Sequence, residues 1–470
     1  MKNLFYKTLF FSIIALLLLV LFQTTFHFFE LKPLVGVTAE VEKPKLTLKN
    51  YIEGSYQEDL EAYSRDNLGF REWLIRGYNQ FLWSCFRKTN NKTIRIGKED
   101  WLFEDVYVRD HYQSLMYDYT DDPDEMREIL EREALRLWKV QEILKEYDIH
   151  IFVNIPPGKD VIYPEYLPEN SSYTRPVGLR AYDYYKKRFD ELGIQYIDNI
   201  PVFKKLKDSV DYPLFPQTGI HWSSIVSVHV FDSIIRYMED IGNQNLNNIS
   251  IGEKYMDATR SPDNDLEQLL NLVFPIKSRP NYYAEVKVLE DSTAVKPYFT
   301  IIGDSFHWNF IYSIPLLDIF KKVPYWYYNY IVYGDENHTS MDDLDIEQEL
   351  MRTDYIMLNY GTVPIYQLGS CFLSNALVHL CYDKSTIDSV AEIIIQNFKE
   401  DPKEYASMVE ESKAKNQSLY QTMYGNAIYM ITMYPERFFK ELRGEKLPVS
   451  RNKNLKAIRK SLSTAESSSE

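Results

Sequence analysis

A serine that could act as a nucleophile follows a short apolar segment in the second half of the sequence. Residues 298–302 (Tyr-Phe-Thr-Ile-Ile) indicate a buried strand, and Gly303, Asp304 and Ser305 come directly after it. A serine just beyond the carboxyl end of a parallel strand lies where open α/β sheets bind ligands, and the N-terminus of a following helix offers N–H groups to an oxyanion. Asp304 is therefore a candidate catalytic residue together with Ser305; the alternative is that the two residues only cap that helix.

A serine nucleophile needs a base, and histidine is the usual base near neutral pH. His221 stands out because it lies in a loop rich in Pro, Gly and Thr, beside Trp222 and directly before a predicted helix. The alternative is a loop histidine that only packs or caps. His307 is a rival base, but it lies only two residues after Ser305, whereas a base must face the nucleophile in space.

The elements that would position these residues alternate between helix and strand. Helices are predicted at 124–147, at 177–192, directly after Trp222 and at 343–352; strands are predicted at 150–155, 195–198, 298–302, 326–333 and 354–358. This alternation predicts an α/β fold with a parallel sheet covered by helices on both faces. From residue 385 onward only helical patterns remain, so a C-terminal helical extension is expected.

The N-terminus indicates export. Lys2 and Lys7 precede an uncharged apolar segment, 8–29, which has the length of a membrane-spanning helix. We expect an uncleaved single-pass anchor with the remaining chain outside the cytoplasm. The alternative is a cleaved signal peptide, for which Val37-Thr38-Ala39 is the only suitable site. The expected divisions are an anchor (1–30), a stalk and helical lead-in (31–90), the α/β domain (91–384), the helical extension (385–445) and a disordered tail (446–470).

Composition narrows the classes of function. The formal net charge is −15, which disfavours binding to nucleic acid. The three cysteines form no C-x-x-C pattern, so no zinc site is expected, and no cofactor is predicted. A bridge between Cys371 and Cys381 is the one pairing considered.

Several short motifs resemble, in the same order, the SGNH-hydrolase-like family of the alginate O-acetyltransferase proteins AlgX and AlgJ, and more distantly DltD. They are the Gly-Asp-Ser strand end, the His-Trp loop, Asp66–Arg71 (DNLGFR), Ile96–Phe103 (IGKEDWLF), and Ile155–Lys159 (IPPGK) with Ile162–Pro168 (IYPEYLP). The resemblance covers roughly residues 50–365. It implies a flavodoxin-like three-layer α/β/α sandwich, with Ser305 as the nucleophile and His221 as the base.

One departure from the family pattern affects the site. The family has D-x-H-W, whose Asp orients the histidine, but this chain has Gly219 at that position. Three interpretations follow: a Ser–His dyad, an orienting carboxylate from elsewhere such as Asp211, or a degenerate glycan-binding or export-scaffold protein. An oxyanion-binding asparagine stays open between Asn154 and Asn359.

The expected function is O-acetyl transfer to a cell-surface or secreted polysaccharide by a membrane-anchored, extracytoplasmic protein. The resemblance also implies an MBOAT-type membrane acyltransferase as the partner that supplies acetyl groups. The dyad interpretation predicts an esterase activity that falls as His221 protonates below about pH 6.5. Lys159 and Arg71 are expected either to contact an anionic glycan or to form structural ion pairs.

Overall fold

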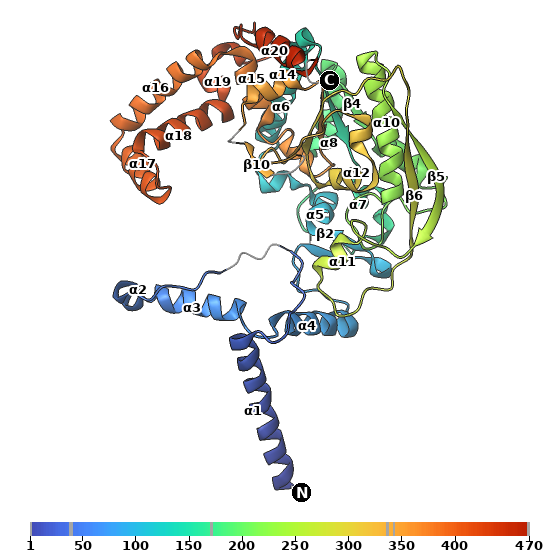
Figure 1. Ribbon diagram of the computed structural model, residues 1–470, viewed down its shortest axis with the longest axis vertical. Coiled ribbons are helices and arrows are strands. Elements are labelled where there is room, and N and C mark those ends of the chain that lie inside the picture. Colours follow the sequence, from blue (N-terminus) through green and yellow to red (C-terminus); the bar gives the residue numbers. More distant parts are fainter. Residues whose placement is uncertain (1, 37–40, 170–172, 335–337, 342–343, 468–470) are drawn as a thin grey trace.

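The computed structural model describes residues 2–36, 41–169, 173–334, 338–341 and 344–467. At its centre lies a seven-stranded sheet of order β10-β9-β8-β7-β11-β3-β4 (Figure 1). Strands β8, β7, β11, β3 and β4 run parallel, whereas β9 and β10 pair antiparallel at one edge. Their bounds are β3 His150–Ile155, β4 Tyr196–Asp198, β7 Phe299–Gly303, β8 Tyr325–Tyr327, β9 Ile331–Tyr333, β10 His338–Ser340 and β11 Tyr355–Asn359.

Helices cover both faces of this sheet, which confirms the expected three-layer α/β/α fold. One layer holds α10 (Ser224–Gly242) and α12 (Trp308–Ser313); the ring of Phe152 on β3 lies 5.3 Å from that of Tyr237 on α10. The other layer holds α6 (Pro123–Leu144), α8 (Ala181–Leu192) and α15 (Phe372–Cys381), with the ring of Trp326 on β8 5.8 Å from that of Phe372 on α15. The core strands are almost entirely buried, so their sequences are continuously apolar rather than alternating.

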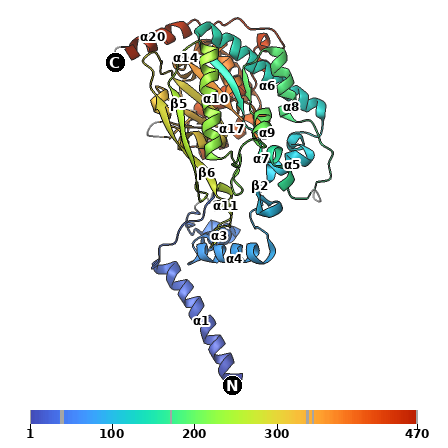
Figure 2. The same ribbon diagram turned by 90° about the vertical axis from the view of Figure 1, so that its right-hand side faces the viewer.

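Two features differ from the expectation for the strands. The single strand predicted at 326–333 is two short antiparallel strands, β8 and β9, because Tyr328 and Asn329 adopt left-handed backbone conformations between them. A long hairpin, β5 (Asn248–Asp257) with β6 (Asn281–Leu289), packs outside α10 and was not predicted (Figure 2). A smaller hairpin, β1 (Ile94–Ile96) with β2 (Leu102–Glu104), leads into the domain.

The N-terminal part extends away from this domain (Figure 1). Helix α1 spans Lys2–Phe26, and Leu4–Phe26 is long and apolar enough to cross a membrane. Helices α2 (Leu48–Glu53), α3 (Ser55–Asp66) and α4 (Arg71–Phe86) follow. The candidate cleavage site Val37-Thr38-Ala39 lies outside the described residues.

The connecting helices are short. They are α5 (Asp105–Gln113), α7 (Lys159–Ile162), α9 (Ile200–Leu206), α11 (Asp265–Leu269), α13 (Leu316–Ile319) and α14 (Ile346–Arg352). Two of them, α7 and α11, begin beside the loop that carries His221 and therefore bear on the candidate site.

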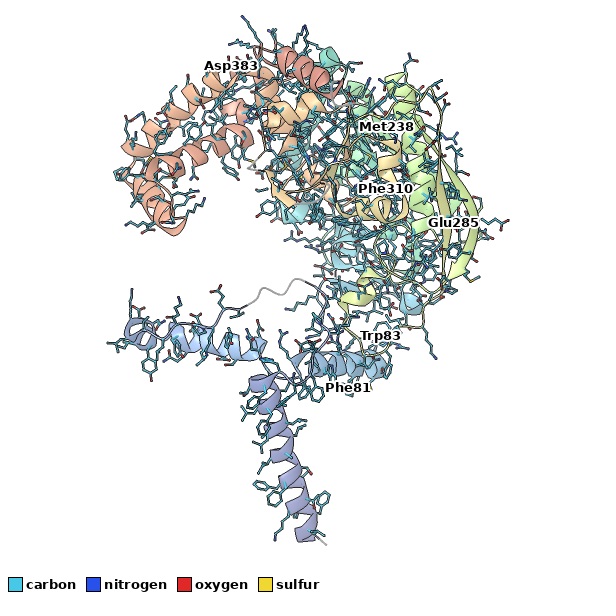
Figure 3. The ribbon with its side chains drawn as sticks, in the orientation of Figure 1. Phe81, Trp83, Met238, Glu285, Phe310 and Asp383 are labelled. Atoms are coloured by element: carbon cyan, nitrogen blue, oxygen red, sulfur yellow. The ribbon has the colours of Figure 1, made fainter. Side chains whose placement is uncertain are left out.

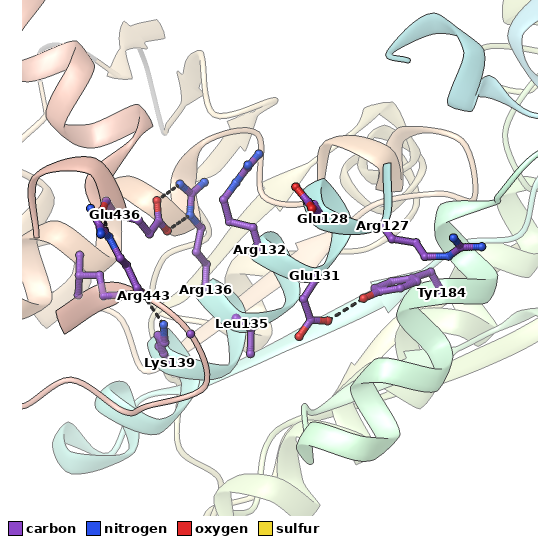
Figure 4. A pocket seen from close by; sticks show the side chains of 12 residues that line it. Arg127, Glu128, Glu131, Arg132, Leu135, Arg136, Lys139, Tyr184, Glu436 and Arg443 are labelled. Carbon is purple, nitrogen blue, oxygen red and sulfur yellow. Dashed lines mark hydrogen bonds and ion pairs between the residues drawn. The ribbon is translucent and has the colours of Figure 1, made fainter. Parts of the chain in front are cut away.

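The C-terminal helices α16 (Lys384–Glu400), α17 (Pro402–Ala414), α18 (Leu419–Met433) and α19 (Pro435–Phe438) form the expected extension. Buried ion pairs and hydrogen bonds join it to α6 (Figure 4). Arg136 lies 2.7 Å from Glu436, and the Lys139 ammonium donates to the carbonyl of Leu442 at 2.6 Å. These contacts line a cavity of about 500 Å³, whose Arg136 and Lys139 side chains already have protein partners.

The tail was predicted to be disordered, and that prediction is wrong for most of its length. Residues 455–467 form helix α20, and Leu455 is fully buried. Arg459 donates to the carbonyls of Met351 and Thr353 and pairs with Asp354 at 2.8 Å. Residues Leu455, Ile458 and Leu462 recur at helical spacing, so the helix has an apolar stripe despite its Lys- and Ser-rich composition.

The cysteines are free. Cys371 precedes α15 and Cys381 ends it. A helix of this length separates its ends by about 15 Å, far beyond the reach of a disulfide.

Candidate active site

Ser305 lies at the carboxyl end of β7, at the start of the short 3₁₀ helix Ser305–His307 that continues into α12. Asp304, directly before it, is buried and fixes this turn. Its carboxylate accepts from the backbone N–H of Phe306 at 3.0 Å and from that of Gly361 at 2.6 Å. Asp304 therefore holds two loops together and caps the turn, while the partly exposed Ser305 is presented at the sheet edge.

His221 faces Ser305 across this edge. Its Nε2 lies 2.7 Å from the Ser305 Oγ, within hydrogen-bond distance, and the imidazole is buried. The ring packs edge-on against Phe306, with centroids 4.9 Å apart, while Trp222 beside it is fully buried against the same phenyl ring. The two residues that the sequence analysis proposes as nucleophile and base therefore lie next to each other.

A third residue completes the arrangement from an unexpected place. Asp265, the first residue of α11, brings its Oδ2 to 2.8 Å from the His221 Nδ1. The N–H of the imidazole is not aimed straight at that oxygen, so the contact is an ion-pair contact rather than a well-aligned hydrogen bond. The other oxygen, Oδ1, accepts from the backbone N–H groups of Ile220 and Leu266 at 2.8 and 2.7 Å, which orients the carboxylate.

The backbone explains why the acid cannot come from position 219. A Cβ built on Gly219 would lie 2.4 Å from the carbonyl oxygen of Asp263. The segment that leads into α11 therefore occupies the space that a side chain at 219 would need. This close approach is also what places Asp265 beside the imidazole. The backbone N–H of Glu267 donates to the carbonyl of Thr218 at 3.1 Å and fastens α11 to the histidine loop.

The charges around His221 favour its protonated form. Burial lowers the pKa of the imidazole, but Asp265, with smaller contributions from Asp304 and Glu104, outweighs burial and raises the pKa above its ordinary 6.5. Burial raises the pKa of Asp304 to about 6, against the effect of its two N–H donors and of His221.

Ser305, His221 and Asp265 line a cleft of about 650 Å³. Tyrosines line much of it, namely Tyr107, Tyr119, Tyr327 and Tyr328. The carboxylates of Glu104, Asp118 and Asp265 also face it, and within the described part of the chain none of its lining residues is Lys or Arg. Burial raises the pKa of Glu104 to about 7, and Asp265 and Asp304 add to this rise while His221 opposes it.

The structure does not bring the other sequence candidates to this site. Asp211 is exposed and pairs with Lys254 on the β5 strand, so it does not contact His221. His307 is fully buried, and burial lowers its pKa to about 3, so it is unsuited to act as the base. Asn154 and Asn359 are buried and hydrogen-bonded to each other at 2.7 Å, behind the cleft.

The two motif cations are structural. The buried Lys159 ammonium donates to three backbone carbonyls, those of Leu102, Gln217 and Gly219, and so holds the histidine loop against β2. Arg71 pairs with Asp66 at 3.1 Å. Neither lines the cleft, so neither supports the expected contact with an anionic glycan. Among the described residues no group of His, Cys, Asp and Glu is arranged to hold a metal ion.

Sequence reasoning missed Asp265 and Glu104. Asp265 ends the acidic turn Pro262-Asp-Asn-Asp265 and is the first residue of the short helix α11. The acidic turn is the only local signal that it gives. Glu104 directly follows the Trp-Leu-Phe of the IGKEDWLF motif, and only the antiparallel pairing of β1 and β2 shows that it borders the cleft.

Comparison with known families identifies the domain. Residues 94–306 match the SGNH hydrolase-like domain of the acetyltransferase AlgX. This segment of the chain therefore resembles an AlgX-type SGNH hydrolase-like domain. This match includes His221, Asp265 and Ser305. A comparison with curated proteins gives no significant match.

Three solved structures resemble the chain at low identity. The O-acetyltransferase domain of Pseudomonas putida AlgJ is 14% identical, with a TM-score of 0.39, over 58% of this chain and 92% of that one. Pseudomonas aeruginosa AlgX is 12% identical, with a TM-score of 0.36, over 61% and 68%. Bacillus cereus PatB1 is 10% identical, with a TM-score of 0.35, over 58% and 96%.

Proposed function

We propose that this protein is an O-acyltransferase in which Ser305, His221 and Asp265 form a catalytic triad. One observation carries the proposal: the imidazole of His221 lies between the Ser305 hydroxyl at 2.7 Å and the Asp265 carboxylate at 2.8 Å, at the edge of an open cleft. A nucleophile, a base and an orienting acid in this order are the parts that acyl transfer through serine requires. The non-catalytic scaffold interpretation is favoured by Gly219, whereas the contact between Asp265 and His221 supports the catalytic one.

The reaction would proceed in two balanced steps. In the first, the Ser305 Oγ attacks the carbonyl carbon of an acyl donor while His221 Nε2 takes the hydroxyl proton; the leaving group departs with that proton and an ester remains on Ser305. In the second, an acceptor hydroxyl gives its proton to His221 and attacks the ester, and Ser305 takes the proton as it leaves. Asp265 stabilises the imidazolium that forms in both steps. The backbone N–H of Ser305 is our candidate oxyanion donor.

The acceptor we propose is a polysaccharide whose repeating unit carries no carboxylate. A uronate chain in the cleft would meet the carboxylates of Glu104, Asp118 and Asp265, and none of the described lining residues is Lys or Arg. Of these three carboxylates, Arg109, which does not line the cleft, pairs with Asp118 alone, at 2.7 Å. The tyrosines of the cleft offer flat apolar faces on which sugar rings can stack. This differs from the alginate-like acceptor that the resemblance alone implies.

The location we propose is extracytoplasmic, with α1 as a membrane anchor, because α1 carries the apolar length and its flanking lysines lie at the N-terminus. Cytoplasmic acyl donors could not reach a domain on that side. An MBOAT-type membrane acyltransferase that passes acetyl groups to Ser305 therefore remains the partner that we propose on the family resemblance.

The test uses the full-length chain in detergent with p-nitrophenyl acetate as donor, and neutral or uronate oligosaccharides as acceptors. We expect release of p-nitrophenol and acetylation of the neutral acceptor, both lost in Ser305→Ala. Acetylation of uronate acceptors equal to that of neutral acceptors would contradict the proposed class of acceptor but not the proposed mechanism. Unchanged turnover in Ser305→Ala would contradict the mechanism.

A further inference from the structure

Helix α4 has its polar and apolar faces reversed with respect to the domain. The side chains that reach the domain are mostly polar: Arg76 donates to Asn271 at 3.2 Å, Asn79 donates to the carbonyl of Leu270 at 2.8 Å, and Gln80 accepts from the N–H of Phe274 at 3.0 Å. Trp83 is the one fully buried residue of this helix. A helix that only supported the domain would turn its apolar stripe inward instead.

The apolar stripe faces away from the domain. Trp73, Leu74, Tyr78 and Phe81 are exposed by 57, 55, 54 and 53% of their surface and recur at helical spacing. Figure 3 shows Phe81 and Trp83 on opposite sides of α4, with Trp83 toward the domain. Large contiguous apolar surfaces of this kind mark a contact with a membrane or a partner protein.

The start of α4 abuts the end of α1. The Gly69 N–H donates to the Thr24 Oγ at 2.8 Å, and a Cβ on Gly69 would lie 2.5 Å from the carbonyl oxygen of Val20. The rings of Phe70 and Phe29 lie 5.9 Å apart. In both views α4 runs across the domain-side end of α1 (Figures 1 and 2). If α1 spans the bilayer, α4 must therefore lie at the depth of the membrane surface.

We propose that α4 is an interfacial helix whose exposed stripe enters the lipid bilayer at the headgroup boundary. Trp and Tyr are the residues that favour this boundary, and an apolar face with polar residues opposite is the pattern of helices that lie in it. The continuity with α1 identifies lipid, rather than a second protein, as the occupant. This proposal rests on α1 as the membrane span and does not depend on the acyltransfer reaction.

The same helix supports the acid of the candidate triad. Trp83 packs in a small apolar cluster with Leu266, which lies in α11, and with Leu270, which directly follows it. Asn79 donates to the Leu270 carbonyl and so holds the end of that segment. Asp265 is the first residue of α11. Lipid contact on one face of α4 would thus fix the segment on its opposite face, which positions Asp265. It would also hold the cleft close to the bilayer surface.

The test measures lipid depth at single cysteines of the chain in liposomes, at the native Cys85 and at one introduced cysteine as a control. Cys85 lies four residues after Phe81 and is exposed, so it reports on the stripe when Cys371→Ser removes the other accessible thiol. The control places the probe on α16, at the far end of the molecule from α1, by Ile393→Cys in a Cys85→Ser, Cys371→Ser background; Ile393 is 63% exposed. Each variant is labelled with bimane and reconstituted with phosphatidylcholine that carries brominated acyl chains.

We expect bimane at Cys85 to be quenched at least threefold more strongly than bimane at Ile393→Cys. Equal quenching at the two positions would overturn the proposal. A second result would overturn lipid as the occupant and assign the stripe to a protein partner. In this result bimane at Cys85 is not quenched in pure lipid, and Cys85 is protected from labelling only in native membranes. Ellipticity identical to that of the wild type shows that each variant is folded.

Discussion

Replacing Asp265 by Asn tests the least expected residue of the site with little change in shape. The Asn Oδ1 can still accept from the N–H groups of Ile220 and Leu266, so α11 and the histidine loop should keep their places. The charge beside His221 is lost, however. The new amide N–H would also donate to the His221 Nδ1, which leaves Nε2 protonated and unable to accept from Ser305.

The size of the effect follows from the contact. Charge centres about 4 Å apart at an effective dielectric constant of about 20 interact by about 4 kcal/mol, which corresponds to roughly 10³-fold in rate. A fully buried acid in such a triad is worth about 10⁴-fold. The Asp265 side chain keeps 29% of its surface exposed, so the smaller figure is expected.

The assay is kcat/KM for p-nitrophenyl acetate between pH 5 and 9. Because Asp265 helps to raise the pKa of His221, the kcat/KM of the wild type should fall on the acid side at a pH above 6.5. In Asp265→Asn this acid limb of the pH profile should lie at a lower pH. Asp211→Asn is the matched control: it removes an exposed carboxylate that pairs with Lys254, and both rate and limb should stay unchanged. A loss of less than threefold in Asp265→Asn, with the limb unmoved, would refute the triad.

Three further variants probe the same site. Ser305→Ala should abolish turnover but change the free energy of unfolding by less than about 1 kcal/mol, since it removes one partly exposed hydroxyl; a residual rate above 1% of wild type would argue against Ser305. Glu104→Gln should stabilise the fold by about 3 kcal/mol at pH 8 but not at pH 4. The pKa of Glu104 is about 7 in the folded state against an ordinary 4.5, so the stability that the protonated carboxyl provides below pH 4.5 is lost as the pH rises through 7. Denaturant unfolding of both proteins at the two pH values measures this, and equal effects at both pH values would contradict it. Gly219→Asp should not restore activity to Asp265→Asn and should lower the unfolding midpoint, since its Cβ has no room; rescue would show that the family position is usable here.

Sequence indicates the nucleophile and base because each carries a local signal. Ser305 follows an apolar strand and a Gly-Asp pair, and His221 precedes a helix in a Pro- and Gly-containing loop. The alternation of helices and strands likewise predicts the parallel sheet, whose buried strands are continuously apolar. These are features that a window of a few residues contains.

The parts that sequence does not reveal depend on the path of the chain between distant segments. Asp265 meets His221 only because the segment before α11 passes within contact of Gly219, and no local pattern encodes that approach. Asp211 is nearer to His221 in sequence, but it lies on the surface beside Lys254. Helix α20 also depends on a contact with a distant segment. Its composition is rich in Lys and Ser, which predicts disorder, but its three apolar residues become ordered by packing on α14.

The central claim is that His221 activates the hydroxyl of Ser305 for attack on an acyl group. Sulfonylation by phenylmethylsulfonyl fluoride reports this step most directly, because the adduct on an activated serine is stable and can be located by peptide mass spectrometry. The account predicts one adduct per chain, on Ser305, that is lost in His221→Ala and slowed in Asp265→Asn. An adduct on another residue, or labelling of Ser305 at the same rate in His221→Ala, would contradict it.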